Sequence, residues 1–170
     1  KFDYGNIKLG YKIYYPEGFD NEKKYKGDIL LVSHEFSRTG APVVLLDAAK
    51  ELVNLGYFVV VTSPKDGPIR NEILNIGAIA IIDPSLSNIK DKEKTCYAFD
   101  NFICEFDFVI INSMVCHNLI GRYNNTEIPI MWWLHEGDYS LMNLKNSLPK
   151  TLGDNITVKC VGNYALEMLK

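Results

Sequence analysis

Six short apolar runs alternate with segments of helical character along this 170-residue chain, and this alternation is what most restricts its fold. The runs are Ile29–Val32, Phe58–Thr62, Ala78–Ile82, Phe108–Asn112, Ile130–Leu134 and Ile156–Val161. Continuous apolar runs of this length are typical of strands that are buried on both faces of a parallel sheet. Because strands that alternate with helices form right-handed βαβ crossovers, we predict an α/β fold, a Rossmann-like three-layer α/β/α domain with a mainly parallel sheet.

The segments between these runs carry helix signals. We predict helices at Pro42–Leu55, Ile69–Ile76, Thr95–Glu105, Met114–Asn124, Tyr139–Asn146 and Tyr164–Leu169, and a loop at Ser85–Lys94. Gly56 and Gly77 follow the first two helices as stop signals. Residues 1–27 are rich in tyrosine and lysine, and we predict an N-terminal extension that packs a short strand, near Tyr11–Tyr15, on one domain formed by residues 28–170.

Composition excludes several classes of protein. The hydrophobic content of 47% describes an ordered globular chain, and the net charge of −3 gives no bulk attraction to nucleic acid. No run of about 18 apolar residues is present to span a membrane. The four cysteines are scattered and form no C-x-x-C pair, which favours a reducing cytoplasm without a disulfide frame or a zinc site.

The loop between the first main strand and its helix indicates an anion site. Pro42 suits the first position of a helix, which would make Ala41 the cap and leave the N–H groups of Val43 and Val44 without acceptors. Such groups at the carboxyl end of a strand favour anions, although water satisfies them equally well. Arg38, in the same loop, could bind a phosphate through two hydrogen bonds, or stay solvated.

Two His-Glu pairs follow strands at the edge of the sheet where ligands bind in open α/β folds. The pair His34-Glu35 follows the first main strand, and His135-Glu136 follows the fifth. Either histidine could contact a substrate, or merely hydrogen-bond a loop carbonyl. Neither pair has the spacing of a metal site.

Other polar residues end strands near the same edge. Asp66 lies in a turn after the second strand, and Asn112 with Ser113 follows the fourth, so we predict that they line the cleft with His34 and Glu35. His117, on the next helix, is predicted to be a surface or packing residue.

Several stretches, in order, resemble the N-terminal domain of a GT-B glycosyltransferase of the retaining family 4. They are Ile29–Pro42 with its glycine loop, Leu45–Lys65, Asp66-Gly67-Pro68, Asp107–Ser113, Trp132–Glu136 and Val161–Ala165. The resemblance covers about residues 28 to 170. It implies one half of a GT-B fold.

The resemblance also implies a function. Such enzymes move a sugar from a nucleotide-sugar donor to an acceptor, here a glycan or a lipid-linked molecule, without a required metal or other cofactor. Gly40 and Ala41, with Arg38, would bind the donor phosphates, and His135 and Glu136 would line the cleft near the reacting sugar as catalytic residues.

The resemblance leaves the domain organisation open to test. The family's donor-binding C-terminal domain carries an E-x7-E motif that this chain lacks, so we expect half an enzyme that is inactive without its missing domain. We expect a cytoplasmic protein, which could also bind peripherally to the inner face of a membrane. The alternative function is a stand-alone α/β module that binds a nucleotide, a sugar or a protein and catalyses nothing.

Overall fold

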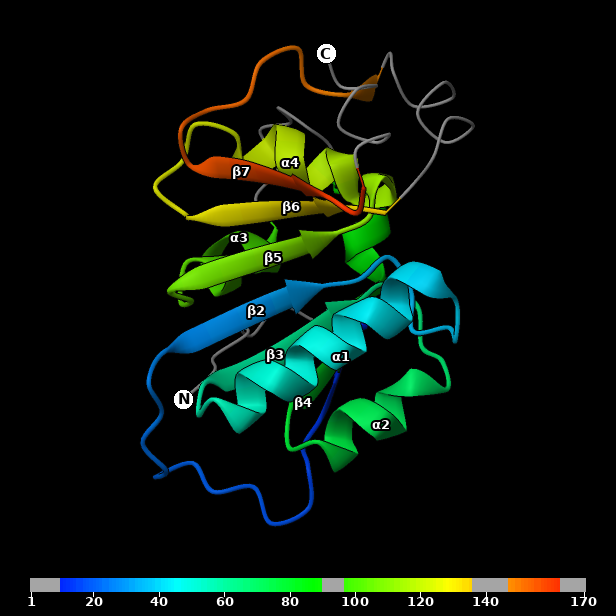
Figure 1. Ribbon diagram of the computed structural model, residues 1–170, viewed down its shortest axis with the longest axis vertical. Coiled ribbons are helices and arrows are strands. Elements are labelled where there is room, and N and C mark those ends of the chain that lie inside the picture. The colour runs from blue at the N-terminus through cyan, green and yellow to red at the C-terminus, as the bar shows by residue number, and fades with distance from the viewer. Residues whose placement is uncertain (1–9, 90–96, 136–146, 163–170) are drawn as a thin grey trace.

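The computed structural model describes residues 10–89, 97–135 and 147–162, and these residues form one α/β unit (Figure 1). Their seven-stranded sheet has the order β1-β4-β3-β2-β5-β6-β7. The strands are β1 (Lys12–Tyr14), β2 (Asp28–Val32), β3 (Phe58–Ser63), β4 (Ile79–Ile82), β5 (Phe108–Asn112), β6 (Ile130–Leu134) and β7 (Ile156–Cys160). β1 pairs antiparallel with β4, and the other neighbours pair in parallel. The predicted Rossmann-like α/β fold with a mainly parallel sheet is confirmed.

Helices cover both faces of the sheet. α1 (Gly40–Asn54) and α2 (Ile69–Asn75) lie over β2, β3 and β4 on one face, whereas α3 (Ala98–Ile103) and α4 (His117–Tyr123) lie on the other face (Figure 1). Two 3-10 helices complete the described elements, η1 (Pro84–Ser87) and η2 (Met114–Cys116). Each face has its own apolar core: Leu45 and Ala49 of α1 pack on one side, and Phe99 and Phe102 of α3 on the other.

The centre of the sheet is a topological switch point. From β2 the chain moves outward through β3 and β4, and it then returns to the other side of β2 to form β5, β6 and β7. Val32 at the end of β2 therefore lies beside both Thr62 of β3 and Ile111 of β5. The loops that leave β2 and β5 diverge toward opposite faces, and such a divergence opens a crevice at the carboxyl ends of the strands.

The start of α1 differs from the prediction. The helix begins at Gly40 with Thr39 as its N-cap, so Ala41 is already inside the first turn. The N–H of Val43 donates to the carbonyl of Thr39 at 3.1 Å, so this amide is not free for an anion as predicted. The physical reason is that Pro42 tolerates any first-turn position, because no first-turn N–H has a helical acceptor.

The other helix predictions are met in part. The predicted loop at 85–94 begins as η1, because Asp83 Oδ1 accepts from the Ser85 N–H at 2.9 Å and caps the turn. The predicted helix 114–124 is divided into η2 and α4, after Ser113 with φ of 79°. The predicted helices at 139–146 and 164–169 lie outside the described residues.

Residues 10–27 pack against the main body of the domain. β1 extends the sheet at the β4 edge, at the position predicted for a short strand. The rings of Phe19 and Tyr25 contact Phe58 at centroid distances of 6.3 Å and 5.2 Å. The N–H of Lys26 donates to the Gly56 carbonyl, which leads the chain into β2.

Candidate functional site

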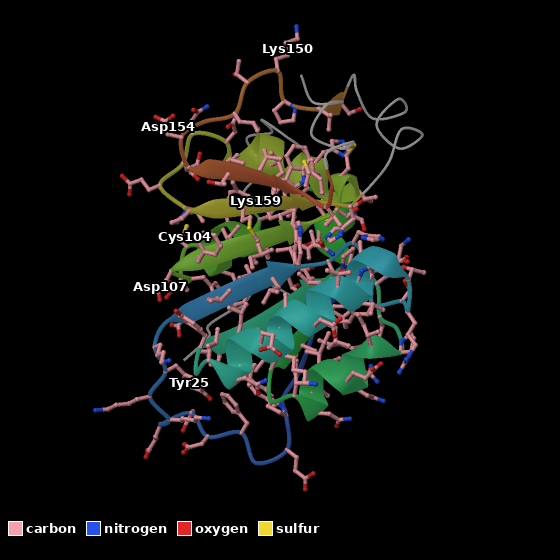
Figure 2. All side chains as sticks on the ribbon, in the orientation of Figure 1. Tyr25, Cys104, Asp107, Lys150, Asp154 and Lys159 are labelled. Atoms are coloured by element: carbon pink, nitrogen blue, oxygen red, sulfur yellow. The ribbon has the colours of Figure 1, made fainter. Side chains whose placement is uncertain are left out.

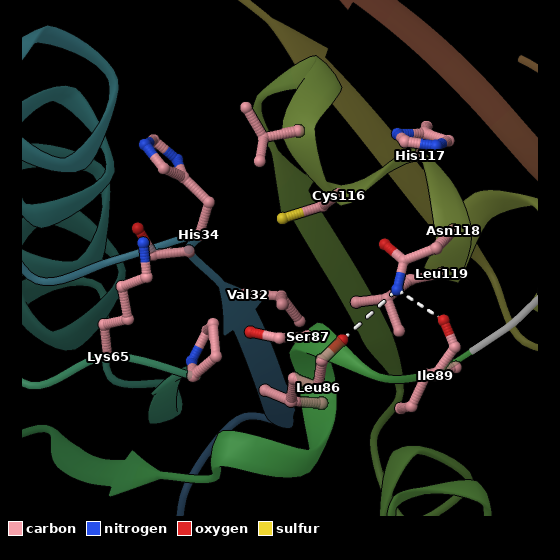
Figure 3. Close-up of a pocket in the computed structure, with 13 residues that line it drawn as sticks. Val32, His34, Lys65, Leu86, Ser87, Ile89, Cys116, His117, Asn118 and Leu119 are labelled. Carbon is pink, nitrogen blue, oxygen red and sulfur yellow. Dashed lines mark hydrogen bonds between the residues drawn. The ribbon is translucent and has the colours of Figure 1, made fainter. Parts of the chain in front are cut away.

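A cavity of about 350 Å³ opens at the carboxyl ends of β2 and β3, beside η1 and the start of α4 (Figure 3). Its walls come from four segments that are distant in sequence: 32–34, 64–65, 86–89 and 115–119. The cavity therefore lies at the switch point of the sheet, on the face that α3 and α4 cover. We call it the switch-point pocket.

One wall carries His34 and Lys65 and faces His117 and Asn118 on the other (Figure 3). His34 follows β2, where the Ser33 N–H donates to the Thr62 carbonyl at 2.8 Å and the Ser33 hydroxyl donates to the Glu35 carbonyl at 2.7 Å. These bonds fix the backbone on each side of His34. The backbone of His34 is thus positioned by the sheet.

The Lys65 wall is locked to the His34 wall through Phe36, a fully buried side chain. The Phe36 N–H donates to the Lys65 carbonyl, and the Phe36 carbonyl accepts from the Ile69 N–H, both at 3.2 Å. A Cβ added at Gly67 would lie only 2.2 Å from the Phe36 carbonyl oxygen, so the two loops touch backbone to backbone. Only glycine permits that approach.

The opposite wall is built on the turn after β5. Ser113 Oγ accepts from the Val115 N–H at 3.1 Å and starts η2. His117 Nδ1 lies 3.2 Å from the Met114 carbonyl, which only accepts, so Nδ1 carries the proton and Nε2 of the neutral ring is an acceptor. Asn118 Nδ2 donates to the carbonyls of Leu86 and Ile89, and these bonds tie α4 to η1 (Figure 3).

The chemistry of the pocket is a mixture of apolar walls and a few polar groups, as in many small-molecule sites. The polar side chains that line it are those of Ser33, His34, Lys65, Ser87, His117 and Asn118. The described lining residues include no Asp or Glu. The nearest carboxylate in the same loop is Glu35, whose Oε1 is 3.9 Å from His34 Nε2 and also accepts from the Ser37 hydroxyl at 2.6 Å.

The residues predicted to bind phosphate lie on the first turn of α1 and just before it. Gly40 and Ala41 open the helix, and a Cβ at Gly40 would meet nothing within 4 Å. Arg38 is not free in the loop, since its guanidinium is 2.7 Å from Glu72 of α2. Phosphate binding by these three residues stays a prediction.

Asp66, Asn112 and Ser113 were predicted to line the cleft, and the structure places them in the supports around it. Asp66 accepts from the Gly67 N–H at 2.7 Å and pairs with Arg70. Asn112 is fully buried, and its Nδ2 donates to the Ala41 carbonyl at 2.8 Å. None of the three lines the switch-point pocket. A role for them on a donor-facing surface stays a prediction.

His135 lies at the end of β6, two strands from β2 in the sheet order. It is partly buried and its ring packs against Trp133, with centroids 4.8 Å apart. The end of β6 is tied to the turn after β5, because the Ser113 N–H donates to the Trp133 carbonyl at 2.8 Å. Its predicted partner Glu136 lies outside the described residues. Catalysis by either residue stays a prediction.

The sequence prediction missed Lys65, Ser87 and Asn118 as pocket residues, and His117, which was predicted to be a surface or packing residue, lies on the pocket wall. The sequence contained a signal that indicated two of these four residues, Lys65 and His117. In a Rossmann-like order the loops after the second and fourth predicted strands flank the loop after the first. Polar side chains in those two loops, Lys65 and His117, therefore belong beside His34.

Carboxylate and thiol side chains lie at the opposite end of the sheet, where the parallel strands begin. Asp107 and Cys104 lie at the amino ends of the strands (Figure 2). The N–H of Asp28 donates to the Asp107 carboxylate at 2.8 Å, and burial, followed by the charge of Asp107, raises the pKa of Asp28. Within the described residues, no three His, Cys, Asp or Glu side chains converge on a metal position, and no helix is long and apolar enough to cross a membrane.

An open parallel sheet with a pocket at its switch point defines a class of ligand-binding α/β domains. The family model described as Glycosyl-transferase family 4 matches residues 26–150, which is most of the chain. The chain belongs to Glycosyl-transferase family 4, and the predicted resemblance to the N-terminal half of a GT-B enzyme is confirmed. No curated protein and no solved structure matches the chain.

Proposed function

We propose that this domain holds the acceptor in a glycosyltransferase that moves a sugar from a nucleotide-sugar donor to a glycan or lipid-linked acceptor. One observation carries the proposal. The switch-point pocket lies wholly within the stretch that matches the glycosyltransferase family, at the sheet edge where α/β enzymes bind their ligands. The pocket offers hydrogen-bonding groups on two sides, which suits a polar molecule such as a sugar.

The donor phosphates are proposed to lie at the first turn of α1. The N–H groups of Gly40 and Ala41 have no helical acceptor, and the positive end of the helix dipole favours an anion there. The space around Gly40 is open to a ligand. Asn112 holds this turn through the Ala41 carbonyl, and its buried Oδ1 has no hydrogen-bond partner among the described residues.

His135 is proposed to act beside the reacting sugar, together with Glu136. Transfer of a sugar builds positive charge on the sugar ring and negative charge on the departing phosphate. A neutral imidazole can accept a hydrogen bond from the sugar, and a protonated one can stabilise the phosphate. The ring of Trp133 supports His135 from one side. The second domain is proposed to supply the cationic partners of the leaving diphosphate.

The experiment is His135→Ala in the complete protein, with transfer from a panel of nucleotide sugars measured beside urea unfolding. Loss of one contact to the reacting centre costs about tenfold to a thousandfold in turnover. We expect that loss with a nearly unchanged free energy of unfolding. Normal turnover with lowered stability would make His135 a structural residue. Absence of transfer by the wild-type protein from every donor would favour the binding-module alternative.

A further inference from the structure

Buried polar side chains gather at one edge of the sheet. Among the described residues, the buried polar residues all lie at or just after the carboxyl end of a strand: Ser33, Thr62, Ser63, Asp83, Asn112 and Ser113. In four of them the side chain hydrogen-bonds the backbone two residues further along and so shapes its own turn. The side chain of Asn112 instead reaches another element, because its Nδ2 donates to the Ala41 carbonyl of α1 at 2.8 Å.

The burial of the Asn112 side chain is only half compensated. Its Oδ1 has no hydrogen-bond partner among the described residues, although the residue is 0% exposed. The Ala41 carbonyl lies inside α1, where the Leu45 N–H is its partner in the helical pattern, so this carbonyl does not require the bond from Asn112. A buried amide with an unsatisfied oxygen lowers stability, and local rules of this kind are broken mostly at functional sites. The fold alone therefore does not explain an asparagine at this position.

The first turn of α1 is weakly fixed by its own sequence. Thr39 is the N-cap but makes no side-chain hydrogen bond to the turn, and the first turn contains no acidic residue. The Thr39 hydroxyl lies 2.8 Å from the Ser37 hydroxyl instead. Gly40, the first residue of the helix, is the residue type with the greatest backbone freedom. The bond from Asn112 therefore fixes a turn that lacks the usual cap, and the missing cap leaves the Gly40 and Ala41 N–H groups available to a ligand.

The end of β5, which carries Asn112, is held firmly by its neighbours. Ser113 has a φ of 79°, a conformation that residues other than glycine rarely adopt. Its N–H donates to the Trp133 carbonyl at 2.8 Å, and its carbonyl accepts from Trp132 Nε1 at 3.1 Å. These bonds to β6, together with the pairing of β5 with β2, give Asn112 a fixed base from which to hold α1.

We infer that Asn112 is a positioning residue for the transfer reaction: through the Ala41 carbonyl it holds the first turn of α1 where the Gly40 and Ala41 N–H groups meet the donor diphosphate. The inference rests on the proposed function. Because Asn112 is fully buried, it acts through the turn and not on the donor itself. Without this bond the turn would shift and the diphosphate would lose well-aligned hydrogen bonds. The switch-point pocket contains no residue of α1, so binding of the acceptor would be retained.

The test is the steady-state kinetics of the complete protein, with the nucleotide sugar that the wild type uses, beside thermal unfolding. It compares Asn112→Leu, which is similar in size, and Asn112→Ala, which is too small to clash, with the control Asn155→Leu. Asn155 is matched to Asn112 because its Nδ2 also donates to backbone carbonyls, those of Tyr123 and Ile128, but at the amino end of the sheet.

We expect both Asn112 variants to lower kcat/KM for the donor by about tenfold or more, because misplaced hydrogen-bond donors to a departing phosphate cost at least this much. The KM for the acceptor should stay unchanged. The unfolding midpoint should fall less in Asn112→Leu than in Asn155→Leu, since the first substitution also removes a buried unsatisfied oxygen. Asn155→Leu should leave kcat/KM for the donor as in the wild type.

An unchanged kcat/KM for the donor in both Asn112 variants of an active protein would overturn the inference and leave the proposed function standing. An equal loss of kcat/KM in Asn155→Leu would also overturn it, because general loosening would then explain the effect. So would an acceptor KM that rises in proportion to the loss of donor kcat/KM. If leucine prevents folding, the alanine variant decides alone. Absence of transfer by the wild type from every donor would overturn the proposed function, and the inference with it.

Discussion

Asp100 joins α3 to α4 through a cluster of hydrogen bonds on the face of the sheet that these two helices cover. Its carboxylate accepts from the Tyr97 N–H at 2.8 Å, from Arg122 Nε and Nη2 at 2.7 Å and 2.6 Å, and from the Tyr123 hydroxyl at 2.7 Å. Burial alone would raise the pKa of Asp100, but the hydrogen bonds from Arg122, Tyr97 and Tyr123 outweigh it and hold the pKa below its ordinary value.

Replacing Asp100 by Asn should lower the free energy of unfolding by about 2 kcal/mol at neutral pH, because the charge-assisted bonds to Arg122 are lost. The pKa of Asp100 is lower in the folded state than in the unfolded chain, so its stabilisation is present above about pH 4 and is lost as the pH falls through the folded value. The difference between Asp100→Asn and the wild type should therefore shrink at low pH.

Urea unfolding at neutral and at acidic pH checks this expectation. Asp47→Asn, at an exposed position of α1, is the matched control and should change little at either pH. A loss of stability in Asp100→Asn that is equally large at acidic pH would show that shape, and not the carboxylate charge, matters at this position.

At the scale of elements, the pocket depends on the contact between the loops after β2 and β3. Gly67→Ala should lower the free energy of unfolding by about 2 kcal/mol, in the range of other overpacked sites, because the new methyl group collides with the Phe36 carbonyl. Gly40→Ala is the control, since its Cβ meets nothing within 4 Å. Thermal and urea unfolding measure both. Equal stability of the two variants would mean that the loops separate at little cost.

The strands could be predicted from the sequence, and so could the start of α2 at Ile69, but the starts of α1 and α3 could not. Residues 108–112 and 130–134 match β5 and β6 at both ends, because a polar residue or a proline lies on each side of these apolar runs: Asp107 and Ser113, and Pro129 and His135. The start of α1 was misplaced, because Pro42 fits several positions in a first turn and the sequence does not reveal which one. The break between η2 and α4 depends on the positive φ of Ser113, and no pattern in the sequence predicts that conformation.

For the whole molecule, the position of the site was predictable and most of its residues were not. The carboxyl edge of the sheet follows from the alternation of strands and helices, and the structure places His34 at that edge, on the wall of the switch-point pocket. Lys65 and His117 become neighbours of His34 only through the order β3-β2-β5. Asn112 and Asp66 have the residue types of a site, but hydrogen bonds to the backbone and to Arg70 engage them in support of the loops. Residue type alone cannot separate these two roles.

The switch-point pocket is proposed to be the acceptor site of a glycosyltransferase. Val115 lines this pocket with a side chain that is 52% exposed, so Val115→Trp should fill the pocket without disturbing the core. Leu55→Trp is the matched control, because Leu55 is 54% exposed at the end of α1 and does not line the pocket.

The most direct measurement is the steady-state kinetics of sugar transfer by the complete protein with either substitution. We predict that Val115→Trp raises the KM for the acceptor by about tenfold or more, which corresponds to about 1.4 kcal/mol of lost binding. The KM for the donor and the unfolding midpoint should stay as in Leu55→Trp. An acceptor KM that is unchanged in Val115→Trp would contradict the account, since an acceptor held in this pocket could not bind past the indole ring.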